Sequence, residues 1–363
     1  MPEVIEPVRH GPRQLGILLC AFIALTPAAA TRGLGAPAPH PDARLAAQRH
    51  GLTLDARALA VIDGGETVVR LQPSAEARDV ALIGVVRIPV ARQTYMAAAE
   101  DFASWLRTPT RTRLGVFGLP PVVATLRDLR VAPDEARDLQ DCRPGSCTTK
   151  LSAADMDRLR AGVDWSAPDV GSRVAALIRE RLLALLVDYA ARGSAALPVY
   201  DDKAPVRSAD AFQALLSQSA LLTHALPALG SYLQSFPSAR LSGARDVLHW
   251  SEDSGTRFRP VLSLTHSVIW APPYPNDWSL IVSRQLDANH YFEAALEVVS
   301  VSDRIADGER SAAYLVIERR FRFDAVPHIG MLSMRTRTVN GLRDRLQADL
   351  RREQRSWTSA QYR

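Results

Sequence analysis

Three strand-like segments in the last third of the chain each carry, on an apolar face, one basic side chain that could bind or activate a polar group. Side chains alternate between the two faces of a strand. On this basis His266, His290 and Arg319 share the apolar faces of residues 261–270, 290–298 and 312–323. An imidazole titrates near neutral pH, and a guanidinium binds carboxylates and phosphates. We therefore expect the three groups to project into one interior and to orient a polar or anionic head group there.

Aromatic residues on the same faces would form the walls of this site. Trp270 shares the face of His266, and Phe292 shares the face of His290. The same pattern also fits ordinary core residues, or strand ends that reach solvent. A buried Arg319 needs a carboxylate partner from the protein or from a ligand. Residues 288–297 could instead form a helix, because Ala, Glu and Leu favour one.

Local signatures of known catalytic sites are missing from the sequence. The chain contains no G-x-S-x-G, H-E-x-x-H, P-loop or G-x-G-x-x-G motif. The histidines that follow residue 30 show no close spacing typical of metal ligands. We expect neither a metal nor a cofactor.

The N-terminus has the features of a secretory signal peptide, which we assign to residues 1–30. Arg9 and Arg13 precede an apolar run at residues 15–25, and a small-residue A-x-A site follows at residues 28–30. The run is shorter than the about 20 residues of a membrane span. An uncleaved N-terminal anchor is the alternative. Gly and Pro predict a flexible leader over residues 31–45, and we expect a periplasmic or secreted protein.

Cys142 and Cys147 are the only cysteines beyond the predicted signal peptide. In an exported chain they can oxidise. Pro144 and Gly145 between them favour a type II turn, which would fold the segment into a short hairpin and bring the sulfurs together. A redox centre would usually be C-x-x-C, and a zinc site would need further ligands nearby. We therefore predict a structural disulfide.

Arginine gives the chain its positive charge, and the excess lies near the C-terminus. The formal net charge is +5, and residues 304–363 contain 13 Arg against 7 acidic residues. Such a segment could contact an anionic membrane or nucleic acid, or dock an envelope protein. Because acids are interspersed among the arginines, we expect a solvated helix face and no nucleic-acid partner.

The order of the predicted elements indicates an α+β fold. Residues 46–150 mix strands with a helix over 92–106, and they include an expected hairpin over 58–71 and a short strand over 122–131. Residues 151–236 are almost entirely helical, and residues 237–363 are strands followed by a long helix. Consecutive strands without intervening helices favour an antiparallel sheet. We expect a curved antiparallel sheet packed on the C-terminal helix, with an inserted helical block.

This arrangement resembles a START-like (SRPBCC, helix-grip) domain. Residues 79–105 contain a strand of the type G-x-V-x-I followed by a helix, and the chain ends in consecutive strands and a long helix. The helical block departs from that family's compact pattern. The stretches DCRPGSCTTKL, SLTHSVIW, ANHYFEAAL and NGLRDRL also resemble an uncharacterised family of exported bacterial proteins. The START-like resemblance implies an apolar cavity that holds lipids, sterols or polyketides.

Three functions fit these observations. The first is a periplasmic binding or carrier protein for an apolar or amphipathic small molecule. The second is an enzyme that uses His266 or His290 as a general acid or base. The third is a non-catalytic envelope module that docks a partner through the apolar helices within residues 171–236 or through the Arg-rich C-terminal helix.

Overall fold

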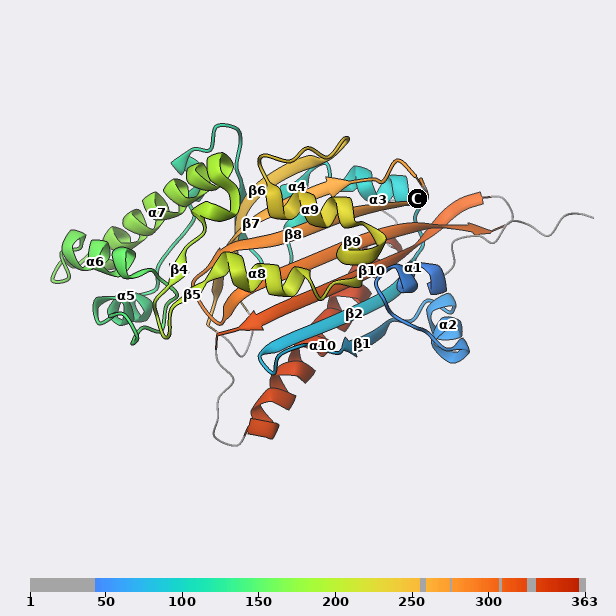
Figure 1. The fold of residues 1–363 in the computed structure, drawn as a ribbon, viewed down its shortest axis with the longest axis horizontal. Helices are drawn as coiled ribbons and strands as arrows, with labels where there is room; N and C mark the ends of the chain where they lie inside the picture. Colours follow the sequence, from blue (N-terminus) through green and yellow to red (C-terminus); the bar gives the residue numbers. More distant parts are fainter. Residues whose placement is uncertain (1–42, 255–258, 275, 307–308, 325–330, 359–363) are drawn as a thin grey trace, which may run out of the picture. The chain divides into compact units, whose positions relative to one another are not determined.

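An eight-stranded antiparallel sheet organises the computed structural model, which describes residues 43–254, 259–274, 276–306, 309–324 and 331–358 (Figure 1). The strand order is β1-β2-β10-β9-β8-β7-β6-β3. The strands of this sheet are β1 (Val68–Gln72), β2 (Asp79–Ile88), β3 (Arg113–Val116), β6 (Arg245–Asp253), β7 (Val261–Trp270), β8 (Trp278–Ala288), β9 (Phe292–Ala306) and β10 (Glu309–Phe323). A separate two-stranded ribbon consists of β4 (Val199–Tyr200) and β5 (Val206–Arg207).

Helices cover both faces of the sheet, so the strands lie between two helical layers. The α-helices are α1 (Ala43–Arg49), α2 (Ala56–Asp63), α3 (Arg92–Ala98), α4 (Phe102–Leu106), α5 (Pro133–Gln140), α6 (Ala153–Gly162), α7 (Val170–Arg192), α8 (Ser208–Leu216), α9 (Pro227–Ser235) and α10 (Met331–Thr358). Short helical turns are η1 (Val123–Leu126), η2 (Gly193–Ala196) and η3 (Leu221–Ala225).

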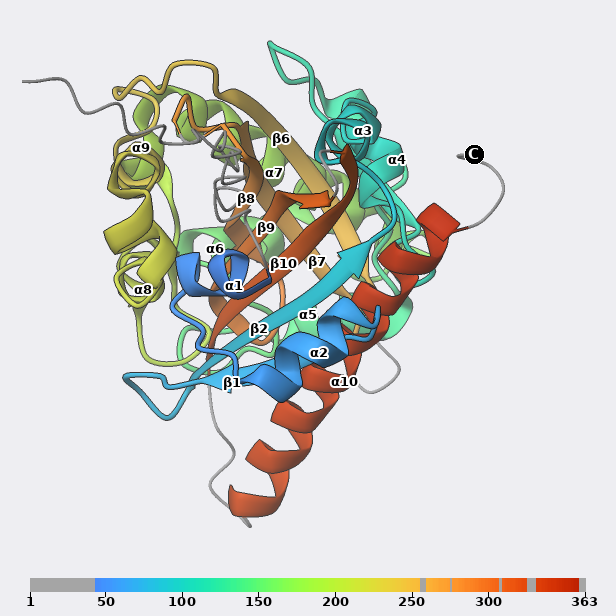
Figure 2. The same cartoon turned by 90° about the vertical axis from the view of Figure 1, so that its right-hand side faces the viewer.

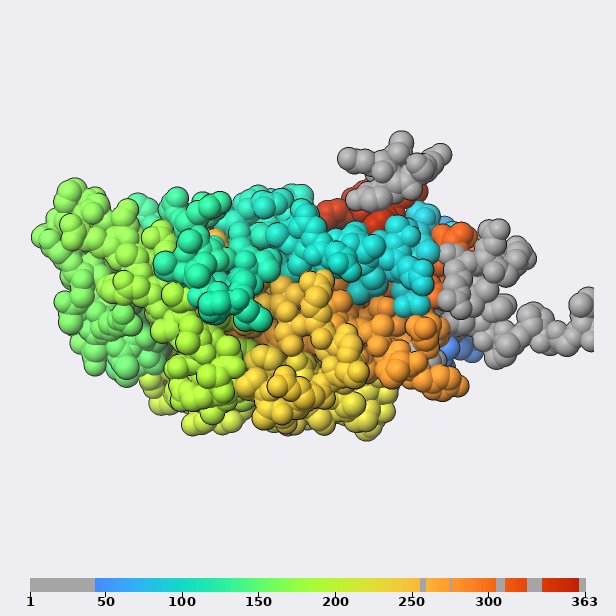
Figure 3. Space-filling view, turned by 90° about the horizontal axis from the view of Figure 1, so that it is seen from above, coloured from blue at the N-terminus to red at the C-terminus, as the bar shows by residue number. Residues whose placement is uncertain are grey.

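One face of the sheet packs against α3, α4 and α10, and we call it the α10 face. The opposite face packs against α1 and α2 at one end, α8 and α9 in the middle, and α7 at the other end. Figure 2 shows the sheet between α8 and α9 (yellow) on one side and α10 (red) on the other. Figure 3 looks onto α3 and α4 (cyan) and the segment that follows β3 (teal).

Helix α10 lies directly on β2, and a glycine permits the close approach. A Cβ atom added at Gly84 would lie 2.4 Å from Leu350 Cδ1. Leu346 and Leu350 are both fully buried in the core of this face. The α+β class, the antiparallel sheet and the long C-terminal helix predicted from the sequence are thus confirmed. The stretch 288–297, for which a helix was the alternative, contributes to strand β9.

The helical block is inserted between β3 and β6 and shares its core with the sheet. Helices α5, α6 and α7 form one buried cluster that includes Leu248, Trp250 and Leu264 from β6 and β7. The block begins at Pro133, before the expected boundary at residue 151. Because strand residues complete its core, the block depends on the sheet for burial of its apolar face.

Two local predictions are wrong. The first arm of the expected hairpin, from residue 58, instead lies in helix α2 (Ala56–Asp63), whose first turn is capped by the Asp55 side chain accepting from the Ala58 amide. Only residues 68–72 form a strand there. The expected strand over 122–131 is instead the turn η1 and a loop. Leu126 and Leu129, three residues apart, are its buried side chains, and this spacing is helical.

The predicted helix over 92–106 is two helices. Helix α3 ends at Ala98, and α4 begins at Phe102 after Asp101, whose side chain accepts from the Ser104 amide. The predicted signal peptide lies outside the described residues. Helix α1 begins at Ala43, within the expected leader. No helix in the described part of the chain is long and apolar enough to cross a membrane.

The predicted disulfide joins Cys142 and Cys147, whose Cα atoms are 4.6 Å apart. Between them, Gly145 has a φ of 80°, which fits the predicted turn, and Arg143 pairs with Ser146 as a single antiparallel bridge. The residues before Cys142 form helix α5 rather than a hairpin arm.

Loss of this disulfide should destabilise the protein measurably. We expect the double variant Cys142→Ser/Cys147→Ser to lower the free energy of unfolding by about 2 kcal/mol, the chain-entropy value for so short a loop. Urea unfolding of the oxidised protein and of the variant measures the difference. Equal stabilities would show that the loop is held by its other contacts alone.

Candidate functional site

His266 lies on the face opposite α10 and has no exposed surface. Its Nδ1 is 2.8 Å from Tyr189 Oη, and its Nε2 is 2.8 Å from Asp246 Oδ1. Burial lowers the pKa of His266, although the Asp246 carboxylate opposes this shift. Trp270 lies on the same face, buried among α8 and α9 residues, and donates from Nε1 to Ser242 O. Both residues are therefore closed off from solvent.

His290 lies at the connection between β8 and β9, away from His266. Its Nδ1 is 3.0 Å from the carbonyl oxygen of Thr148, and its Nε2 is 3.6 Å from Glu135 Oε1. It therefore ties the loop after the disulfide and helix α5 to the end of the sheet.

Arg319 lies on the α10 face, so the predicted common interior of His266, His290 and Arg319 is wrong. Arg319 is directly opposite Glu297 on β9, whereas Leu296 is opposite Arg320. Both alternating rows of β9 contain buried apolar residues, Val299 and Val301 in one and Leu296 and Val298 in the other, because helices cover both faces of the sheet. Alternation alone therefore does not reveal which row faces α10.

Phe292 and Arg319 do share a face. A register shift between Arg322 and Phe323 pairs Phe323 with Phe292, which removes Phe292 from the row of Ala294 and Leu296. The Phe292 ring centroid lies 5.1 Å from both the Phe321 and the Phe323 centroids. We call these three half-buried residues, Phe292, Phe321 and Phe323, the aromatic cluster.

A row of polar side chains crosses the α10 face beside this cluster. The strand register places Ser267, Ser283, Glu297 and Arg319 opposite one another on the adjacent strands β7, β8, β9 and β10. We call these four residues the polar row. Ser283 and Glu297 are half-buried, so part of the row is open to solvent. An apolar core is the usual surface between a sheet and a covering helix, and a polar row there marks a distinct site.

His249 on β6 extends the polar row. Its Nε2 is 3.0 Å from Ser267 Oγ, which is 2.8 Å from Ser283 Oγ. Burial, followed by the positive charge of Arg111, lowers the pKa of His249 to about 3, so the ring is neutral at physiological pH. The neutral ring and the two hydroxyls form a hydrogen-bonded chain from the core to the half-buried Ser283.

Charges at the other end of the row compensate one another. Arg319 donates from Nε to Glu297 Oε2 at 2.5 Å and from Nη1 to Asp349 Oδ2 at 2.7 Å. Burial alone would lower the pKa of Arg319, but the two carboxylates outweigh it and raise the pKa. Burial alone would raise the pKa of Asp349, but Arg319 and the neighbouring arginines hold it at about 2. Arg319 thus finds its carboxylates within the protein.

Ser267, Ser283 and His249 are candidate residues that the sequence analysis missed. The polar alternates of β7, at positions 263, 265 and 267, were visible as the face opposite His266. They resemble a solvated strand face, and nothing local indicates that this is the face of the sheet covered by α3, α4 and α10. His249 belongs to β6, which also contains Asp, Ser and Glu residues and so lacks a clear apolar alternation.

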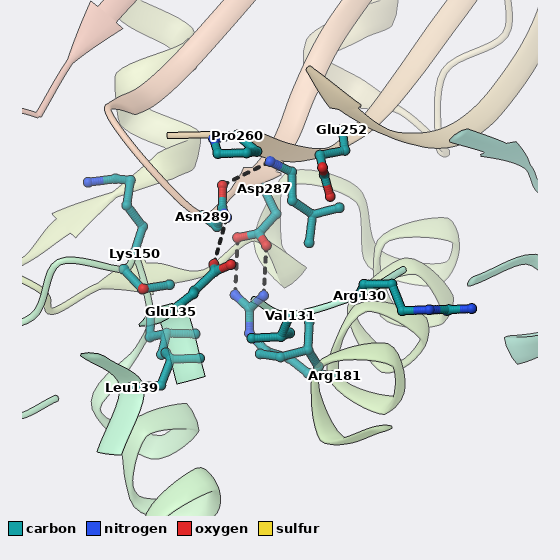
Figure 4. Close-up of a pocket in the computed structure, with 14 residues that line it drawn as sticks. Arg130, Val131, Glu135, Leu139, Lys150, Arg181, Glu252, Pro260, Asp287 and Asn289 are labelled. Atoms are coloured by element: carbon teal, nitrogen blue, oxygen red, sulfur yellow. Dashed lines mark hydrogen bonds and ion pairs between the residues drawn. The ribbon is translucent and has the colours of Figure 1, made fainter. Parts of the chain in front are cut away.

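A separate small pocket lies where α5, α7 and the segment after the disulfide meet the ends of β6, β7 and β8 (Figure 4). Its internal space of about 30 Å³ admits one or two water molecules. Arg181 donates to the two carboxylate oxygens of Asp287 at 2.7 and 3.0 Å and to Asp155 at 2.9 Å. The pocket is therefore too small for an organic ligand and is built around an ion-pair cluster.

Metal binding has no support in the described part of the chain. No group of three or more His, Cys, Asp or Glu side chains there is arranged to hold a metal ion. The donors that lie close together are instead paired with arginines, as Asp155 and Asp287 are with Arg181.

Comparisons with known proteins do not assign the chain to a family. No protein-family model matches it, and neither a curated protein nor a solved structure matches it.

Proposed function

We propose that this protein binds an amphipathic small molecule on the α10 face of its sheet. The apolar part would pack on the aromatic cluster, and the polar part would hydrogen-bond to the half-buried Ser283 of the polar row. The observation that carries the proposal is that three phenylalanine rings, in contact with one another, remain half-buried beside half-buried hydrogen-bonding groups. Ligand sites commonly combine apolar walls with a few placed polar groups.

The resemblance to START-like domains supports the same location. In the helix-grip arrangement the cavity lies between the sheet and the C-terminal helix, which is the side where Phe323 and Arg319 lie. The proposal moves the site away from His266 and His290, because each of these is buried against protein partners. It also makes binding, rather than acid–base catalysis, the preferred activity.

We further propose that the protein works in the periplasm or outside the cell. The Cys142–Cys147 disulfide supports this location, since such bonds persist in oxidising compartments. The N-terminal pattern of a secretory signal, with Arg9 and Arg13 before the apolar run, points the same way.

Replacement of Phe321 by asparagine should weaken binding of an apolar probe. We expect the Kd for N-phenyl-1-naphthylamine to rise about tenfold, which corresponds to about 1.4 kcal/mol of lost apolar contact. Fluorescence titration of purified protein measures the change. The control is Val187→Asn, which makes a similar apolar-to-amide change at an exposed position of α7.

Native mass spectrometry provides a direct test of the ligand. Protein purified from the cells that naturally produce it should carry a bound amphipathic molecule, and Phe321→Asn should carry less of it. A wild-type protein that carries no small molecule and does not bind the dye would contradict the proposal. If the wild type and Phe321→Asn bound the molecule equally, the site would lie elsewhere.

A further inference from the structure

The segment that follows β3 exposes apolar side chains to an unusual degree. Leu119 is 82% exposed, Val122 is 52% exposed and Val123 is 47% exposed. Between Gly118 and Ala124 every residue is apolar, and we call residues 118–124 the apolar loop. Figure 3 shows this segment (teal) on the outside of the molecule. Isolated exposed apolar residues are ordinary, whereas consecutive ones mark an interaction site.

Firm anchors on both sides hold the apolar loop away from the core. The Phe117 amide donates to Leu248 O at 2.8 Å, and the Trp250 Nε1 donates to Thr125 O at 2.8 Å. Leu126 and Leu129 are fully buried in the core shared by the helical block and the sheet. The loop therefore leaves and rejoins a rigid base, and its exposed tip is a fixed feature of the fold.

Arginines surround the base of the loop. Arg179 donates to the carbonyls of Leu126 and Leu129 at 3.1 and 2.7 Å, and Arg130 also donates to Leu129 O. The side chain of Arg127 is 81% exposed, and Asp128 is its nearby acid. A rim of three arginines at the base of an apolar loop favours an anionic partner.

The composition of the loop distinguishes a lipid surface from a protein surface. A protein interface needs about one hydrogen bond per 100–200 Å², and residues 118–124 have no polar side chain to supply one. Pro120 and Pro121 also lack backbone N–H groups, which reduces the donors that would lose water in an apolar phase. In a bilayer the phosphates lie outside the acyl chains. An apolar tip that reaches the acyl chains would therefore place the arginines at its base at the level of the phosphates.

We infer that the apolar loop inserts into the interfacial region of an anionic lipid bilayer, with Arg127, Arg130 and Arg179 facing the lipid phosphates. This surface is separate from the proposed ligand site, because the aromatic cluster lies on β9 and β10 and the loop follows β3. The inference therefore stands or falls independently of the small-molecule proposal.

A tryptophan placed in the loop reports insertion directly. In the full chain, Val122→Trp should show a blue-shifted emission with vesicles of equal parts phosphatidylcholine and phosphatidylglycerol. The new tryptophan adds emission to that of the wild-type protein, and brominated lipids in these vesicles should quench most of this added emission. Val187→Trp, at a similarly exposed valine on α7, is the matched control and should show neither effect. Adding Leu119→Asp to Val122→Trp should weaken vesicle affinity by about tenfold or more.

The comparison between the two tryptophan variants excludes effects of other apolar segments, because those are present in both proteins. Equal quenching of the two variants would overturn the inference. Binding to vesicles of phosphatidylcholine alone that equals binding to the vesicles with phosphatidylglycerol would also overturn it, since the arginines would then have no role. Absence of quenching with both lipid compositions would also overturn it, and a protein partner would then be the alternative occupant of the loop.

Discussion

Replacement of Arg181 by leucine should lower the free energy of unfolding by about 3–5 kcal/mol. Arg181 is paired with both oxygens of Asp287 and with Asp155, and the Tyr200 hydroxyl donates to Asp287 at 3.1 Å. Burial alone would lower the pKa of Arg181, but the two carboxylates outweigh it and raise the pKa. The variant leaves two acidic groups at the pocket without their cation, and this accounts for the large cost.

A matched arginine on the same helix provides the control. Arg173 pairs with Asp169 one helical turn away, and both side chains are about half exposed. Arg173→Leu should therefore leave the urea midpoint unchanged within error. If Arg181→Leu were as stable as Arg173→Leu, the ion-pair cluster would not hold the helical block on the sheet.

His249 should make the protein sensitive to acid well above the pH at which carboxylates protonate. The unfolded imidazole binds a proton below about pH 6.5, whereas the buried ring in the folded protein binds one only below about pH 3. The unfolded state binds more protons between these values, so stability falls as the pH falls through this window. At 1.36 kcal/mol per unit, the loss approaches an upper limit of about 5 kcal/mol.

The variant His249→Gln removes this titration and should flatten the pH dependence. We expect the slope of the unfolding free energy between about pH 6 and pH 4 to decrease by up to about 1.4 kcal/mol per pH unit. Urea unfolding across this range measures the slope, and above pH 7 the wild type and the variant should have parallel profiles. Glu318 and Asp349, whose folded pKa values are about 2, remain in both proteins and lose their contribution at lower pH. An unchanged slope would show that another group dominates.

The sequence predicts the main elements because their patterns are long and consistent. Leu346 and Leu350 recur at helical spacing, and the strands from β7 to β10 follow one another without helices between them. Shorter elements are ambiguous. Residues 56–63 combine helix-favouring Ala with the β-branched Val61 and Ile62, and the Asp55 cap decides in favour of helix. Val122 and Val123 favour a strand, but both are exposed on an irregular segment.

The candidate site is harder to predict than the fold, because it depends on which strand face meets α10. Period-two patterning correctly groups His266 with Trp270, yet it does not relate their strand to the strand of Arg319. The register does so, since Arg319 is opposite Glu297 and Glu297 is opposite Ser283. The register shift at Phe323, which returns Phe292 to the side of Phe321, has no signature in the sequence.

The pairing of β2 with β10 also determines when this protein can assemble. Ile88 is aligned with Ala313, so this strand pairing joins two regions that are synthesised far apart in time. Closing such a long loop costs chain entropy before any contact repays it. A nascent chain therefore stays without its completed sheet until its last third emerges. Such a delay would keep the chain unfolded long enough for the export that we propose above.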